Sequence, residues 1–102
     1  MPEWTKLAEA GAVPAGQLKG FTVRMQPIVV ANVDGDLYAL EDQCSHQEFP
    51  LADGELDGSD LVCIYHGARF DVCTGRNKSL PAVRPVKSYP VEARDDGIYV
   101  EL

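Results

Sequence analysis

The sequence reads Cys44-Ser45-His46 and, after sixteen intervening residues, Cys63-Ile64-Tyr65-His66. These two motifs contain both histidines and two of the three cysteines of the chain. Each motif offers one thiolate and one imidazole within a tight local spacing, which suits a metal centre that two short loops hold from opposite sides. The spacing therefore predicts a metal centre whose ligands are Cys44, His46, Cys63 and His66.

The arrangement of the ligand types separates two candidate metal centres. A structural Cys2His2 zinc site usually places its two cysteines together and its two histidines together, whereas each motif here is mixed. A Rieske [2Fe–2S] cluster has two histidines in place of cysteines on one of its irons. Each motif would then give its cysteine to one iron and its histidine to the other. The mixed motifs favour the iron–sulfur cluster and leave a zinc site as the alternative.

Several residues extend the pattern beyond the ligands: Leu51, Gly54, Gly67, Phe70-Asp71, Thr74-Gly75, Pro81 and Tyr89-Pro90-Val91. Together with the two motifs, they make the chain similar over essentially its whole length to the small Rieske-type ferredoxins of multicomponent aromatic-ring dioxygenases. The resemblance implies one [2Fe–2S] cluster held by the four predicted ligands. Ile64, where the family often has proline, and the additional Cys73 are modest departures that change no ligand.

Two residues are candidates for covering the cluster. Gly67 directly follows the last ligand, and a residue without a Cβ lets the backbone pass close to a bulky cluster. In the resembling family a proline-containing loop covers the cluster, and Pro81 stands in the corresponding place. Cys73 precedes a Thr-Gly turn signal, so we interpret it as a small residue near a hairpin tip without a redox role.

The ligand count limits the function. A terminal oxygenase would also need a mononuclear iron held by two histidines and a carboxylate, but His46 and His66 are the only histidines. The chain also has no glycine-rich dinucleotide fingerprint. The resemblance therefore implies a one-electron carrier, and no enzyme, that passes electrons from a flavoprotein reductase to a terminal aromatic-ring dioxygenase. The alternatives are a small Rieske subunit of an assimilatory nitrite reductase, a zinc-stabilised interaction module and a regulatory iron–sulfur sensor.

Length and composition indicate one ordinary globular domain over residues 1–102, with 45% hydrophobic and 25% charged residues. No apolar run approaches the ~20 residues of a membrane span, and residues 1–6 show no secretory signal. We therefore expect a cytoplasmic monomer without a membrane partner. The net charge of −7 argues against nucleic acid as a partner. It indicates either that a protein partner is basic or that the charge only keeps the chain soluble.

Short strands separated by turn signals predict an all-β fold, a β-sandwich or partly open barrel. We expect an edge strand over residues 4–8 and a hairpin that turns at Asp34-Gly35. The second motif is expected between strands 61–63 and 68–72 of a small three-stranded sheet. We expect a final hairpin from strands 86–91 and 98–100. A cluster-binding subdomain, about residues 43–82, is inserted into a base formed by the remainder.

Overall fold

The computed structural model describes residues 3–42, 52, 54–62, 69–76, 78 and 86–101, and these residues form ten strands and no helix. Accordingly, the described part of the chain has no helix with the length and apolar character of a membrane span. The strands are β1 (Trp4–Ala8), β2 (Leu18–Val23), β3 (Gln26–Val33), β4 (Asp36–Glu41), β5 (Glu55–Asp57), β6 (Asp60–Val62), β7 (Arg69–Asp71), β8 (Ser88–Tyr89), β9 (Val91–Arg94) and β10 (Gly97–Glu101).

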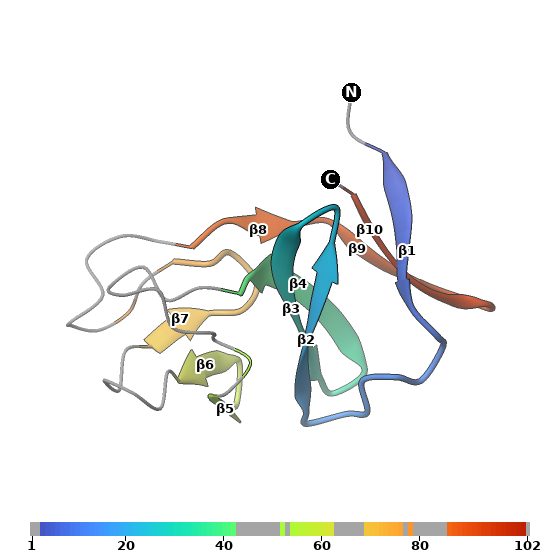
Figure 1. Cartoon of the computed structure of the whole chain (residues 1–102). Coiled ribbons are helices and arrows are strands. Elements are labelled where there is room, and N and C mark those ends of the chain that lie inside the picture. The colour runs from blue at the N-terminus through green and yellow to red at the C-terminus, as the bar shows by residue number, and fades with distance from the viewer. Residues whose placement is uncertain are drawn as a thin grey trace.

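The strands form three antiparallel sheets (Figure 1). The central sheet has the order β2-β3-β4-β8, the sheet β1-β10-β9 lies on one side of it, and the small sheet β5-β6-β7 lies on the other. The small sheet is inserted in the sequence between β4 and β8. The predicted all-β fold, the edge strand over residues 4–8 and the small three-stranded sheet are confirmed.

Strand β3 is buried on both faces and separates two apolar cores. Val29 and Ala31 point into a core shared with the small sheet, whereas Ile28 and Val30 point into a core shared with β10. Alternate residues of a strand face opposite sides, so one strand supplies both cores. This explains why residues 28–31 form an apolar run in place of the alternating pattern of a half-exposed strand.

Two hairpins of the central sheet close through two-residue turns. Asp34 and Gly35 join β3 to β4 with φ values of 54° and 96°, and this turn was predicted from its Asp-Gly sequence. Arg24 and Met25 join β2 to β3 with φ values of 51° and 67°, and the sequence gives no turn signal there. The side chain of Met25 is almost fully exposed.

The predicted final hairpin is wrong in its first strand. Strand β8 pairs with β4, through Tyr89 opposite Ala39, and the partner of β10 is β9, which starts at Val91. Pro90 separates the two pairings, because proline supplies no N–H for a continuous ladder. The chain therefore leaves the central sheet at Pro90 and enters the sheet β1-β10-β9 directly afterwards.

Candidate metal centre

The predicted ligands and covering residues lie outside the described residues: Cys44, His46, Cys63, His66, Gly67 and Pro81. They belong to three segments, residues 43–51, 63–68 and 79–85. The residues that flank these segments are described, so the structure shows where each segment starts and ends.

A hydrogen bond to the side chain of Asp42 links the two residues that flank the first segment, Asp42 and Ala52. The backbone N–H of Ala52 donates to Oδ1 of Asp42 at 2.7 Å, and the N–H of Asp42 donates to the carbonyl of Pro27 at 3.0 Å. Gly20 in β2 leaves room for this contact, since a Cβ there would lie 2.8 Å from Oδ2 of Asp42 and 2.9 Å from Cβ of Ala52. The end of β4 therefore fixes both ends of the segment that contains Cys44 and His46.

The second segment connects β6 to β7. Val62 pairs with Arg69, and Leu61 pairs with Phe70 in the next register position. Leu61 and Phe70 are completely buried in the core shared with β3. This apolar pair holds together the two strands that residues 63–68, with Cys63, His66 and Gly67, connect.

The residues that flank the third segment are hydrogen-bonded to Arg69 of β7 and to Gly75. The N–H of Lys78 donates to the carbonyl of Arg69, and the N–H of Val86 donates to the carbonyl of Gly75, both at 2.8 Å. Gly75 has a φ of +79°, and a Cβ there would lie 2.1 Å from the carbonyl oxygen of Val86. Glycine is therefore required where the chain returns from the segment that contains Pro81.

One hydrogen bond joins the residues that flank the first segment to those that flank the third; we call these flanking residues the anchors. The N–H of Glu41, beside Asp42, donates to the carbonyl of Lys87 at 2.7 Å, and Lys87 follows Val86. The ends of the three segments thus form one connected set at the edge where the central and small sheets meet. The sequence showed the two motifs but not these anchors, because Gly20 and Gly75 matter only through the neighbours that the fold brings to them.

Charged and polar groups surround the anchors. Nζ of Lys78 donates to Oδ1 of Asp60 at 2.5 Å, and this hydrogen bond raises the pKa of Lys78. Cys73 is exposed in the turn that follows β7, as predicted, and its N–H donates to Oδ1 of Asp71 at 2.8 Å. The neighbouring Cys73 thiol raises the pKa of Tyr38.

Residues 3–90 match the family model of the Rieske [2Fe-2S] domain. The chain belongs to the Rieske [2Fe–2S] family. It is 36% identical to the ferredoxin component of biphenyl 2,3-dioxygenase from Rhodococcus jostii (strain RHA1), over 96% of this chain and 92% of that protein.

Solved structures agree with this assignment. The fold matches a ferredoxin of Sphingomonas yanoikuyae B1 with a TM-score of 0.90 and 31% identity, over 98% of this chain and 99% of that one. It also matches a chain in a complex of reduced oxygenase and oxidized ferredoxin in carbazole 1,9a-dioxygenase, with a TM-score of 0.87 and 34% identity, over 95% of this chain and 91% of that one.

The family assignment decides between the candidate cofactors. Its cofactor is one [2Fe–2S] cluster, which sets aside the zinc alternative. The donor set of two thiolates and two imidazoles in mixed motifs fits this cluster. As a ferredoxin of the type found in aromatic dioxygenase systems, the chain is an electron carrier and not an enzyme.

Proposed function

We propose that the chain carries one electron at a time from a flavoprotein reductase to a terminal aromatic-ring dioxygenase. The supporting observation is that ferredoxin components of such systems match it over nearly the full length of both chains. The matched carbazole dioxygenase structure contains a ferredoxin together with its oxygenase. The bound cluster supplies one-electron redox chemistry, and the chain supplies its ligands and a surface for docking.

The proposed ligands are Cys44, His46, Cys63 and His66. The structure supports this set through the anchors, because the two segments that contain the ligands start and end in one connected region. Gly67 is proposed to let the backbone pass close to the cluster, and Pro81 to cover it from the third segment. We propose residues 43–82 as the cluster-binding subdomain, which would include the small sheet and all three segments.

The partners are proposed to bind transiently to a monomer, in the cytoplasm. A net charge of −7 favours a basic docking surface on at least one partner. Surface charges steer association over roughly the Debye length, about 8–10 Å at moderate ionic strength. Electron transfer to that partner should therefore slow as the salt concentration rises.

Spectroscopy and reconstitution test the proposal in two steps. Purified protein should be red-brown and, after dithionite reduction, give the low-average-g EPR signal of a Rieske cluster. Adding it to a candidate reductase and oxygenase should make product formation dependent on this chain, with a rate that falls at high salt. A colourless protein would contradict the cofactor. A red-brown protein that supports a nitrite reductase and none of the dioxygenases would contradict the proposed partner.

A further inference from the structure

Three aspartates lie side by side across the small sheet. Asp57 of β5 is directly opposite Asp60 of β6, and Asp60 is directly opposite Asp71 of β7. We call these three residues the aspartate row. Like charges directly opposite each other on neighbouring strands are destabilising, so this register requires compensation.

Two cations provide that compensation. Arg69 lies two residues before Asp71 on β7 and therefore on the same face of the sheet. Its Nη2 contacts Oδ2 of Asp57, and its Nε lies 3.7 Å from Oδ2 of Asp60. Nζ of Lys78 lies 2.5 Å from Oδ1 of Asp60. The side chain of Asp60 is only 18% exposed, so its carboxylate is partly shielded from solvent where Arg69 and Lys78 approach it.

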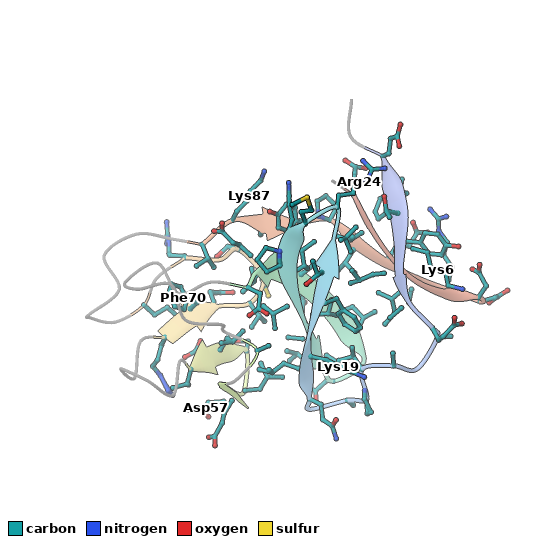
Figure 2. All side chains as sticks on the ribbon, viewed as in Figure 1. Lys6, Lys19, Arg24, Asp57, Phe70 and Lys87 are labelled. Atoms are coloured by element: carbon teal, nitrogen blue, oxygen red, sulfur yellow. The ribbon has the colours of Figure 1, made fainter. Side chains whose placement is uncertain are left out.

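The position of these contacts in the chain connects them to the ligands. Asp60 lies three residues before Cys63, Arg69 three residues after His66, and Lys78 three residues before Pro81. Asp57 projects from the outer edge of the small sheet (Figure 2). Each strand of this sheet has three residues, so few backbone hydrogen bonds oppose a change of register. A slip by one residue would turn every side chain to the other face.

We propose that Arg69 and Lys78 are positioning residues for the cluster, because their bridges across the aspartate row hold β6 and β7 in the register from which Cys63 and His66 extend. This inference rests on the proposed function, since it requires those ligands. Groups outside the ligand set that orient the ligands commonly change metal affinity and redox properties. The guanidinium of Arg69 contacts two carboxylates, those of Asp57 and Asp60, with separate nitrogen atoms. The single ammonium of a lysine at this position would contact only one of them.

The test uses the cluster-loaded protein and three single variants. Arg69→Gln removes the bridge, Arg69→Lys keeps only the charge, and Arg76→Gln is the control. Arg76 is an exposed cation shortly after the end of β7 and makes no ion pair with the described residues. The measurements are the half-life of the visible absorption in air, the EPR g-values and the midpoint potential by protein-film voltammetry.

Arg69→Gln should shorten the half-life at least tenfold and change the g-values, Arg69→Lys should give an intermediate loss, and Arg76→Gln should stay within twofold of the wild type. The one-electron equilibrium constant should change about tenfold in Arg69→Gln, which is about 59 mV. The potential of the control should move by less than a third of that. Equal effects of Arg69→Gln and Arg76→Gln would overturn the inference, because local charge alone would then explain both.

A second substitution distinguishes repulsion within the aspartate row from a general loss of stability in Arg69→Gln. Asp57→Asn in the Arg69→Gln background restores the net charge of the aspartate row and its cations, and should recover the half-life to within threefold of the wild type. If the half-life of the double variant does not recover, the inference is overturned. The proposed function would still stand, provided that the wild type is red-brown. A colourless wild type would overturn both.

Discussion

The base of the molecule and the small sheet are both antiparallel, but they are held together differently. In the base, β3 has eight residues, and Ile28, Val30, Ile98 and Val100 form a core with at most 2% exposure. In the small sheet, each strand has three residues, and the apolar row is Leu56, Leu61 and Phe70. Short strands form few backbone hydrogen bonds, so such a sheet depends on what packs against it, and metal binding is coupled to folding. We therefore expect the base to depend mainly on apolar burial, and the small sheet to depend also on ion pairs and on the cluster.

The largest effect on this difference is expected when the cluster is removed. Cys44→Ala or Cys63→Ala should prevent cluster assembly, and hydrogen exchange in β5, β6 and β7 should then accelerate by about tenfold or more. Exchange in β3 and β10 should change little, because the described buried residues of the core between them come from outside the three segments. Cys73→Ser is the control and should keep the cluster. A colourless Cys73→Ser variant would show that the ligand assignment is wrong.

A pair of core truncations compares the two cores directly. Phe70→Ala should cost about 3–5 kcal/mol and Ile28→Ala about 2–5 kcal/mol of unfolding free energy, because both side chains are completely buried. Far-UV circular dichroism should show a lower Tm for both variants. Visible absorption should show cluster loss below the Tm only for Phe70→Ala. Equal cluster loss in both variants would mean that the two cores act as one unit.

Two glycines with nearly equal φ values provide a matched comparison of anchor and loop. Gly16→Ala, at φ +81° and with no described atom within 4 Å of the new Cβ, should cost about 1–2 kcal/mol from backbone strain alone. Gly75→Ala, at φ +79°, should cost a further 1–3 kcal/mol or so, because its Cβ would meet the Val86 carbonyl. Urea denaturation measures both changes. The same midpoint for both variants would remove the special role of Gly75 as an anchor.

The Arg24-Met25 turn allows the base to be stabilised without touching the cluster. Met25→Gly should raise stability by up to about 1 kcal/mol, because glycine adopts the positive φ of 67° without strain. The Tm should rise by about 4 °C or more for each kcal/mol, with unchanged EPR g-values. Met25→Ala is the control and should give no gain, since alanine keeps the strain. A rise in Tm in the alanine variant would attribute the effect to the removed side chain.

The smallest expected effect concerns pH and a hydrogen bond at the turn between β9 and β10. The Tyr99 hydroxyl donates to Oδ2 of Asp96 at 2.7 Å, and this lowers the pKa of Asp96 and raises the pKa of Tyr99. Stability from Asp96 is present above its ordinary pKa of 3.8 and is lost as the pH falls through the lowered value. Stability from Tyr99 is present below its ordinary pKa of 10.0 and is lost as the pH rises through the raised value.

Tyr99→Phe should therefore lower the Tm most between about pH 4 and pH 10, and the difference from the wild type should shrink at both extremes. Thermal melts over this pH range measure it, with the cluster absorption recorded as a control. The ring that contacts Arg94 is kept in this variant, so a difference that does not depend on pH would contradict the hydrogen bond to Asp96 as its cause.

The sequence predicted the parts of this structure that depend on local chemistry. Asp34-Gly35 marks its turn because these residues adopt positive φ readily. The Arg24-Met25 turn adopts the same geometry with residues that do not favour it, so pairing of β2 with β3 must impose it. The boundary at Pro90 was missed for a similar reason, because β4 and β10 compete for neighbouring parts of one extended segment.

The metal centre likewise has features that local sequence predicts and features that depend on the tertiary fold. Two mixed cysteine and histidine motifs predict a cluster without any structure, because the ligand types carry the chemistry. The aspartate row was not predictable, since Asp57, Asp60 and Asp71 become neighbours only in one strand register. The contact between Asp42 and Ala52 likewise depends on a glycine in another strand.

The pairing of β1 with β10, with Trp4 opposite Glu101, has a consequence for synthesis. The first of the ten strands cannot complete its sheet until the last has left the ribosome. All four proposed ligands are made by residue 66, and synthesis from there to Val100 takes a few seconds at roughly 5–20 residues per second. During that time Ile98 and Val100 are missing from the core of the base. The topology thus creates an interval in which the nascent chain has a full set of proposed ligands but an unfinished core, so cluster insertion into a closed base has to follow synthesis of β10.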